Sequence, residues 1–251
     1  MSIDQGTTGT RVIIMDQAGG LVAKAHQDYR QIFPKPGWVE HDPEDIWQSV
    51  VGTMKAALSE AQIQGSQIAA IGITNQRETV LVWDRKTGQS IYNAIVWQCR
   101  RTQGECEKLR KKGLHKMIAR KTGLVVDPYF SATKVKWILD HVSQAKVRAK
   151  KGDLALGTID TFLLWRLSGG SAHKTDVSNA SRTMLMNIHQ ADWDPDLLKL
   201  FSVERSLLPD ICDSSGVFGK TEGLGFLPDG IPIAGIAGDQ QAALFGQACF
   251  E

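Results

Sequence analysis

An almost wholly apolar run at residues 68–73 is the feature that most constrains how this 251-residue chain can fold. It reads Ile-Ala-Ala-Ile-Gly-Ile, and six polar residues follow it at once, Thr74-Asn75-Gln76-Arg77-Glu78-Thr79. A short apolar run without alternation is typical of a strand buried on both faces in the centre of a sheet. Open α/β sheets bind ligands at the carboxyl ends of such strands. We therefore expect an α/β fold with a ligand site directly after residue 73.

Patterns on both sides of this run predict a mixed sheet flanked by helices, with helical insertions. Period-two and short apolar runs predict strands at 11–16, 21–25, 79–83, 93–97 and 231–237. Helical spacing predicts helices at 43–58, 100–112, 114–121, 131–142, 159–167 and 238–246. The first of these has a strong start, because Asp42 can cap it and Pro43 suits its first turn. Strands at both ends with helices between them indicate one α/β domain with insertions.

Composition excludes several classes of protein. Hydrophobic residues make up 42% and charged residues 22%, with a formal net charge of +2, which excludes a disordered tail and gives no sign of a dedicated polyanion binder. No apolar run approaches the 18 residues of a membrane span, and the N-terminus lacks a signal-peptide pattern. The four cysteines lack the spacing of a zinc site. We therefore expect a cytoplasmic protein with reduced thiols and no membrane span.

The nearly balanced net charge of the whole chain conceals a basic segment at residues 100–151. It carries 15 Lys and Arg against 4 Asp and Glu. Such a segment could bind a polyanion, and steep salt dependence of DNA binding would reveal it. Helix faces exposed to solvent explain the charges more simply, because few aromatic residues lie nearby to stack on bases. We therefore expect no nucleic-acid partner.

A turn rich in glycine and threonine, residues 4–11, is the best candidate for a phosphate site. The patterns GxxxxGK[ST] and GxGxxG, which mark the common nucleotide loops, are absent in the required context. In Asp4-Gln5-Gly6-Thr7-Thr8-Gly9-Thr10-Arg11 two glycines could let backbone N–H groups point into one concavity. Arg11 could reach a phosphate, and Asp4 could hold Mg²⁺ directly or through water. An ordinary polar hairpin turn explains the same residues.

Candidate substrate residues follow two of the predicted strands. Arg77 and Glu78 offer donors and a bidentate acceptor for vicinal hydroxyls, although an exposed ion pair would look the same in sequence. Asp239, after the strand at 231–237, could take a proton from an attacking hydroxyl or could simply cap a helix. Trp97 and Tyr129 could pack against the carbon face of a polyol, or belong to the core.

Together these segments resemble one family, the glycerol kinases among the FGGY carbohydrate kinases of the actin-like ATPase superfamily. The resemblance runs in family order along nearly the whole chain. Asn75-Gln76-Arg77-Glu78 separates glycerol kinases from the sugar kinases of the wider family. The remaining matching segments are Asp4–Thr8, Pro34–Pro43, Gly72–Thr79, Ala94–Gln98, Asp127–Ser131, Ser178–Thr183 and Gly235–Gly246.

The resemblance implies a ribonuclease H-like, actin-like ATPase lobe and ATP-dependent phosphorylation of glycerol to sn-glycerol 3-phosphate. It also implies the roles of particular residues. Glycerol would be bound by Arg77, Glu78, Trp97, Tyr129, Asp239 and Gln240, with Asp239 as general base. The phosphates of ATP would lie at Thr7, Thr8, Gly9 and Arg11, and Mg²⁺ near Asp4. Phosphoryl transfer requires mainly positioning and charge neutralisation, which these residue types supply.

The chain departs from the family pattern at both of its ends. Only Met1 to Ile3 precede Asp4, so we expect the strand before the hairpin to be mostly missing. The family's members are about twice as long, so residues 1–251 resemble the N-terminal, substrate-binding lobe, with the C-terminal nucleotide-binding lobe of the same kinase absent. We expect negligible activity from the 251 residues alone. The alternatives are an inactive lobe that binds glycerol, or a different FGGY polyol or sugar kinase; a homo-oligomer is compatible with the sequence.

Overall fold

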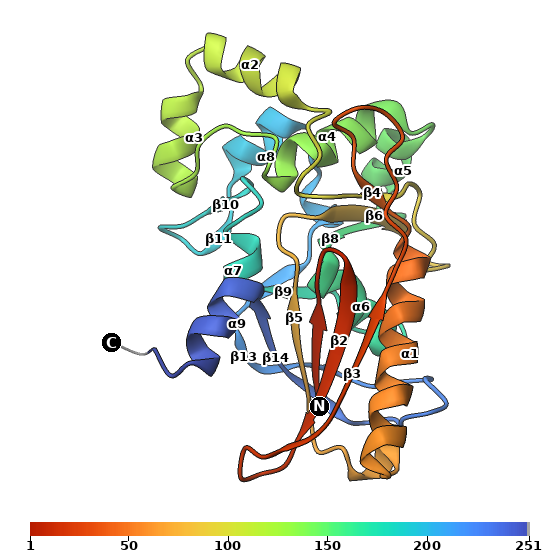
Figure 1. The fold of residues 1–251 in the computed structure, drawn as a ribbon. Helices are drawn as coiled ribbons and strands as arrows, with labels where there is room; N and C mark the ends of the chain where they lie inside the picture. Colours follow the sequence, from red (N-terminus) through yellow and green to blue (C-terminus); the bar gives the residue numbers. More distant parts are fainter. Residues whose placement is uncertain (250–251) are drawn as a thin grey trace.

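The computed structural model describes residues 1–249 and contains two sheets with helices around them (Figure 1). The main sheet has six strands in the order β13-β14-β5-β1-β2-β3. Their bounds are Ser215–Lys220, Pro232–Gly238, Ile71–Asn75, Ser2–Gln5, Gly9–Met15 and Leu21–Asp28 respectively. The apolar run therefore forms the central strand β5, as the sequence predicted.

Strand directions bring three separate segments of the chain to one edge of the main sheet. Strand β5 is parallel to β1 on one side and to β14 on the other. In this register Gln5, Asn75 and Gly238 lie side by side at the carboxyl ends of the three strands. The next residues along each strand begin the Gly6 turn, the Gln76–Thr79 segment and the Asp239 helix. The three candidate segments consequently converge, although they are far apart in sequence.

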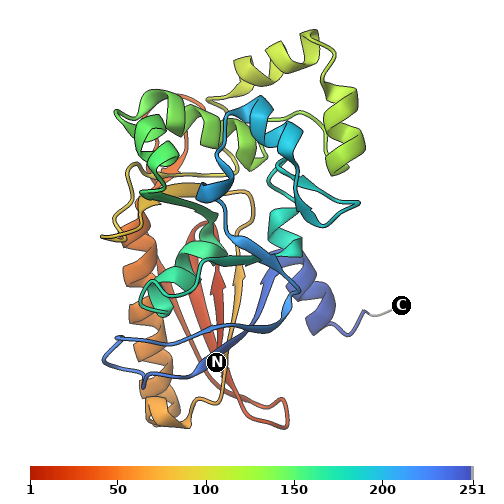
Figure 2. The same ribbon diagram turned by 180° about the vertical axis from the view of Figure 1, so that it is seen from behind.

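Two helices pack on the main sheet in one hydrophobic core. Helix α1 (Pro43–Ala61) begins as predicted, because the Asp42 side chain accepts a hydrogen bond from the N–H of Glu44. Its apolar stripe is buried with that of α6 (Ile159–Leu167) against the central strands. Figure 2, seen from behind, shows α6 in front of these strands. The helix on the other side of the site is α9 (Asp239–Gly246), which follows β14 directly and buries none of its residues.

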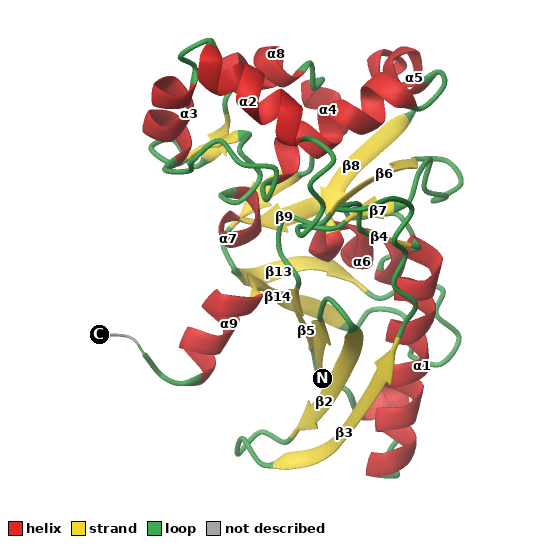
Figure 3. Cartoon of the chain, turned by 45° about the horizontal axis from the view of Figure 1, so that its top comes forward, coloured by secondary structure: helices red, strands yellow, loops and turns green. Residues whose placement is uncertain are grey.

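A second sheet and most of the remaining helices form a separate core at the other end of the molecule. This sheet has the order β4-β7-β6-β8, with bounds Glu40–His41, Ala94–Ile95, Val80–Asp84 and Leu154–Thr158. Figure 3 shows helices gathered beyond it, namely α2 (Gln103–Lys111), α3 (His115–Thr122), α4 (Ser131–His141), α5 (Ala145–Lys151) and α8 (Pro195–Phe201). Smaller elements complete the chain: α7 (Val177–Ala180), β9 (Lys174–Asp176), β10 (Met186–Asn187), β11 (Asp192–Trp193), β12 (Asp210–Cys212) and short 3₁₀ turns at Gly65–Gln67 and Arg205–Leu207.

The strand before the Gly-Thr turn is present, contrary to the expectation that it would be mostly missing. Strand β1 pairs with β2 and with β5 along all four of its residues, Ser2 to Gln5. Four residues are too short for a strand to be predicted from their own pattern. The segment is a strand because neighbouring strands hydrogen-bond to both of its sides. The hairpin therefore rests on a central strand of the sheet. Within residues 1–249 no helix is long and apolar enough to cross a membrane.

Candidate active site

Arg77 and Asp239 form an ion pair where the site segments meet. Arg77 Nε lies 2.8 Å from Asp239 Oδ1, without the alignment of a hydrogen bond. The Arg77 side chain is 4% exposed and that of Asp239 is 51% exposed, so the carboxylate faces solvent while the guanidinium lies beneath it. Arg77 Nη1 also donates to Gln241 Oε1, and the N–H of Gln240 donates to Asp239 Oδ1. This geometry presents a half-exposed carboxylate beside a buried cation.

The backbone at Gly238 is what allows Arg77 to approach Asp239. A Cβ atom at this position would overlap Arg77 Cδ and lie 2.9 Å from Arg77 Cγ. Gly238 is also the residue before α9, and its own N–H donates to the Ser178 hydroxyl. The alternative that Asp239 serves as the helix cap is wrong by one position, since Asp239 is the first helical residue and Gly238 occupies the cap.

Glu78 is buried and forms its ion pair with Arg182 rather than with Arg77. Its side chain accepts a 2.7 Å hydrogen bond from Arg182 Nε, and its backbone has a left-handed φ of 60°. Such a conformation is uncommon for a residue with a Cβ atom and tends to occur at functional sites. Burial raises the pKa of Glu78, and the charge of Arg182 opposes that rise. The alternative of an exposed Arg77–Glu78 ion pair is therefore wrong, because both side chains are buried and each pairs elsewhere.

Two aromatic rings form a wall next to these polar groups. The rings of Trp97 and Tyr129 are 5.3 Å apart at an angle of 57°. Both are partly buried, and burial raises the pKa of Tyr129. The Arg182 guanidinium lies 5.7 Å from the Tyr129 ring. Trp97 Nε1 donates to the hydroxyl of Thr7, so the aromatic wall is joined to the Gly-Thr hairpin.

The Gly-Thr hairpin has the turn that the sequence predicted, but not all of its N–H groups are free. The N–H of Gly6 donates to the Gly9 carbonyl at 2.9 Å and closes the turn. Within residues 1–249 the backbone N–H groups of Thr7 and Thr8 have no acceptor. A Cβ atom at Gly9 would lie 2.7 Å from His26 Cε1, so this glycine is required for contact with the neighbouring strand β3. Thr7 and Thr8 are thus the donors available at the tip.

The carboxylates of Asp4, in β1, and Asp239, at the start of α9, are close enough to interact electrostatically. Asp4 lies directly opposite Arg11 in the β1–β2 pair. Burial raises the pKa of Asp4, the charge of Arg11 lowers it and the charge of Asp239 raises it. Two nearby carboxylates that repel each other are a suitable donor set for a hydrated Mg²⁺, which prefers oxygen ligands. Within the described part of the chain no group of three His, Cys, Asp or Glu is close enough to form a complete metal site.

A buried polar network holds the base of the hairpin. Gln76 Nε2 donates to the Gln5 side chain, the Gly6 carbonyl and the Tyr29 hydroxyl. Tyr29 in turn donates to the carbonyl oxygens of Gly6 and Thr7 at 2.6 and 2.8 Å. His41 completes the network, and burial lowers its pKa to about 4. Satisfied networks of this kind make the local structure rigid.

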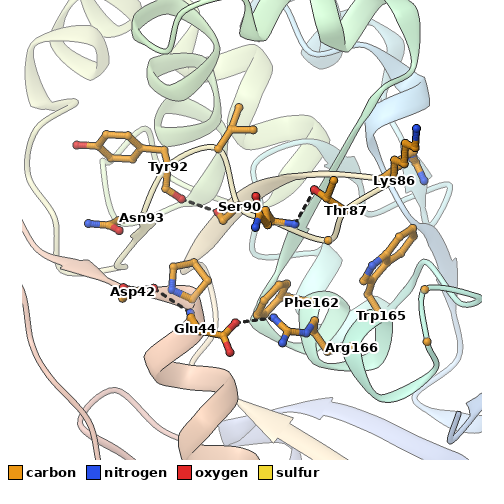
Figure 4. Close-up of a pocket in the computed structure, with 17 residues that line it drawn as sticks. Asp42, Glu44, Lys86, Thr87, Ser90, Tyr92, Asn93, Phe162, Trp165 and Arg166 are labelled. Atoms are coloured by element: carbon orange, nitrogen blue, oxygen red, sulfur yellow. Dashed lines mark hydrogen bonds and ion pairs between the residues drawn. The ribbon is translucent and has the colours of Figure 1, made fainter. Parts of the chain in front are cut away.

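A wide polar groove lies elsewhere, between the start of α1, the end of α6 and the turn after β6 (Figure 4). Arg166 crosses its floor and donates to Glu44 at 2.9 Å, as the close-up shows. Trp165 and Thr87 are among the residues that line it. It contains none of the predicted site residues, so the candidate site is not this groove.

The basic segment at residues 100–151 is largely occupied by internal contacts. Several of its cations form ion pairs, namely Arg100 with Asp127, Arg101 with Glu40, Lys121 with Asp194 and Asp196, Lys136 and Lys146 with Asp140, and Arg148 with Asp84. Lys134 is buried. These contacts favour the interpretation of charged helix faces.

Sheet order, the hairpin beside β1 and the cluster at the strand ends define an α/β domain with a candidate ligand site at one edge of its sheet, and comparison with known families identifies its family. Residues 1–246 match the model described as the FGGY family of carbohydrate kinases, N-terminal domain. The chain belongs to this family. Within it, the chain is 65% identical over 251 residues to a glycerol kinase of Bdellovibrio bacteriovorus, covering all of this chain and 51% of that protein.

Two further relatives agree with this placement. A glycerol kinase 2 of Thermotoga maritima is 55% identical over 251 residues, covering all of this chain and 50% of that protein. Among solved structures, a Plasmodium falciparum glycerol kinase with ADP is 37% identical with a TM-score of 0.93, and all of this chain covers 50% of it. The chain therefore spans about half the length of the relatives it matches. The predicted family and fold class are confirmed.

The roles predicted for the site residues stay predictions, but the structure joins most of these residues by contact or strand pairing: Asp4 with Arg11, Arg77 with Asp239, and Trp97 with both Thr7 and Tyr129. It adds two side chains that sequence reasoning did not assign, Arg182 and Ser178. Both belong to the matching segment Ser178–Thr183, so the segment was noticed without a role for its residues. Arg182 and Glu78 are 104 positions apart, so no local sequence pattern could have revealed that they pair.

Proposed function

We propose that this chain is the glycerol-binding lobe of a glycerol kinase, which transfers the γ-phosphoryl group of ATP to a terminal hydroxyl of glycerol. The observation that carries the proposal is the half-exposed Asp239 carboxylate beside buried Arg77, at the strand ends that also hold the hairpin. Open α/β sheets bind their ligands at such an edge. The 55–65% identity to glycerol kinases supports glycerol over other polyols.

In this proposal different residues bind different parts of the glycerol molecule. Arg77 donates to glycerol hydroxyls and Glu78 accepts from them, while Trp97 and Tyr129 pack against its carbon backbone. Asp239 takes the proton of the reacting hydroxyl while the hydroxyl oxygen bonds to the γ-phosphorus. At the same time the bond between the γ-phosphorus and the bridging oxygen breaks, and ADP leaves. Gln240 lies beside the base.

Phosphate and metal binding complete the proposed chemistry. The free N–H groups of Thr7 and Thr8, the close turn at Gly9 and the cation of Arg11 are suited to phosphate oxygens. Asp4, with Asp239 opposite, would hold Mg²⁺ mainly through water, and the ion would neutralise charge on the phosphates. The proposal includes ATP, Mg²⁺ and a second lobe. It also includes the assignment of residues 1–251 to a single N-terminal lobe. Cytoplasm is the proposed location, consistent with four free cysteines.

Glycerol binding to the 251-residue chain tests the substrate part of the proposal. Calorimetric or NMR titration should detect weak binding, and Arg77→Ala should weaken it by about 1–3 kcal/mol, because hydroxyl groups lose a buried partner. Arg120→Ala is the matched control, since that arginine is exposed on α3, far from the site. Equal affinity in Arg77→Ala would contradict the assigned role, and tighter binding of a pentulose than of glycerol would favour a different sugar kinase.

Catalysis is tested separately, because a lobe that binds glycerol without reacting is the alternative. The 251 residues alone should show negligible turnover with ATP and glycerol in a coupled assay. Joined to the half of the Bdellovibrio relative that they do not span, they should form glycerol phosphate. Asp239→Asn should abolish that turnover by removing the base, while Asp153→Asn, an exposed carboxylate before β8, should not. An inactive hybrid that still binds glycerol would favour the binding-only alternative.

A further inference from the structure

One short segment, Asp176 to Arg182, contacts both halves of the proposed glycerol site. From its end, Arg182 Nε donates to Glu78 Oε1 at 2.7 Å. From its start, the Ser178 hydroxyl accepts a 2.8 Å hydrogen bond from the N–H of Gly238, the residue before Asp239. The segment contains α7 and the turn that follows it. It therefore links the Glu78 side of the site to the Asp239 side.

The segment is itself held firmly, so it can fix what it touches. Buried Asp176 caps α7 by accepting from the N–H groups of Ser178 and Asn179, and it also accepts from the Ser214 hydroxyl. The Asn75 side chain, at the end of the central strand, donates to Asn179 Oδ1 at 3.0 Å. These contacts tie α7 to the carboxyl end of β5, the strand that leads into Glu78.

Arg182 is the contact that determines where the Glu78 carboxylate points. Glu78 is 1% exposed, and burying its charge without a partner would be costly. The cations Arg77 and Lys134 also act on its charge, but neither forms an ion pair with it in the described part of the chain. The Arg182 guanidinium also lies 5.0 Å from the Phe130 ring and 5.7 Å from the Tyr129 ring. A planar guanidinium can pair with a carboxylate and lie against aromatic rings at the same time.

We propose that Arg182 is a positioning residue of the glycerol site, which fixes the Glu78 carboxylate through Nε and supports the Tyr129 wall from behind. The proposal rests on the proposed function in the preceding subsection. In it Arg182 does not touch glycerol; it holds the acceptor and the ring that do. A lysine keeps the charge but lacks the planar face and the fixed donors, so Arg182→Lys should restore only part of the effect.

Glycerol titrations of the 251-residue chain test this role. Arg182→Gln should raise the dissociation constant for glycerol at least about 10-fold. The dissociation constant of Arg182→Lys should lie between those of Arg182→Gln and the wild type. Arg120→Gln, an exposed arginine on α3, should match the wild type. Unchanged affinity in Arg182→Gln, with normal binding by the wild type, would overturn the proposal and leave the proposed function intact.

A carboxyl titration gives a readout that does not depend on glycerol. In protein labelled with ¹³C at glutamate carboxyl carbons, the Glu78 signal is assigned by its loss in Glu78→Gln. Arg182→Gln should move its midpoint to higher pH, because the nearest cation is removed. An unmoved midpoint would overturn the Arg182–Glu78 contact. Absence of glycerol binding in the wild type would instead overturn the proposed function, and the carboxyl titration would still decide on the contact.

Discussion

Trp97 Nε1 donates a 2.9 Å hydrogen bond to the hydroxyl of Thr7, a residue 90 positions earlier in the chain. One partner stands in the proposed glycerol wall and the other at the tip of the proposed phosphate hairpin. This contact therefore joins the groups that would hold the acceptor to those that would hold the donor. In a phosphoryl transfer, where the enzyme contributes mainly alignment, such a link affects the reaction more than its own small energy suggests.

Replacing Thr7 with valine should separate these two parts without changing the side-chain shape. Thr7→Val leaves the indole N–H of Trp97 without its acceptor, at a cost of about 1 kcal/mol. Glycerol affinity should therefore fall about fivefold, as measured by calorimetric titration. Thr8→Val is the control, because the Thr8 side chain is exposed. Equal effects of the two substitutions would show that the Trp97 contact does not matter.

A methyl group at position 238 should displace Arg77 from Asp239. The added Cβ of Gly238→Ala would overlap Arg77 Cδ, and Arg77 is too deeply buried to move freely. Glycerol binding should fall at least about 10-fold, and the melting temperature should fall as well, because the crowded Arg77 side chain is buried. Gly235→Ala on the same strand is the control, because its Cβ would meet nothing closer than 3.8 Å. Normal glycerol binding by Gly238→Ala would refute the assigned geometry.

The network under the hairpin should make stability fall with acid. Burial lowers the pKa of His41 from 6.5 to about 4, so the folded state resists a proton that the unfolded chain accepts. Its contribution is complete above pH 6.5 and is lost as the pH falls toward 4. Relative to His41→Gln, the wild type should therefore lose about 2 kcal/mol between pH 7 and 4.5. Urea unfolding of both proteins at several pH values measures this loss, and an equal pH dependence of the two unfolding free energies would contradict it. The comparison cancels the opposite effect of Asp160, because burial raises the pKa of Asp160 to about 6 in both proteins.

Much of the main sheet could be predicted from local pattern. The apolar run before Thr74 has the composition of a central strand, and polar residues at its end mark a ligand edge in any open α/β sheet. Asp42 with Pro43 marked the start of α1 in the same way. The same pair recurs at Asp194 and Pro195, where it starts α8, so that unpredicted helix carried a readable signal.

What could not be predicted depends on contacts between distant parts of the chain. Strand β1 is strand-like because β2 and β5 pair with both of its sides, not because its four residues have a pattern. Arg77 and Glu78 are neighbours in sequence, yet one pairs with Asp239 and the other with Arg182. Glu78 also has a left-handed backbone, a conformation that a glutamate in a sequence does not predict.

Buried Lys134 should make stability rise with pH in the alkaline range. Its Nζ donates to the carbonyl oxygens of Tyr129 and Phe130, and burial lowers its pKa to about 7 from 10.5. Between these values the unfolded chain binds a proton that the folded chain releases, so folding becomes more favourable as the pH rises. The wild type should gain about 3 kcal/mol relative to Lys134→Met between pH 7 and 9.5. Urea unfolding at both pH values measures the difference, with Lys136→Met on the same helix as control; a difference independent of pH would mean that Lys134 stays charged in the folded protein.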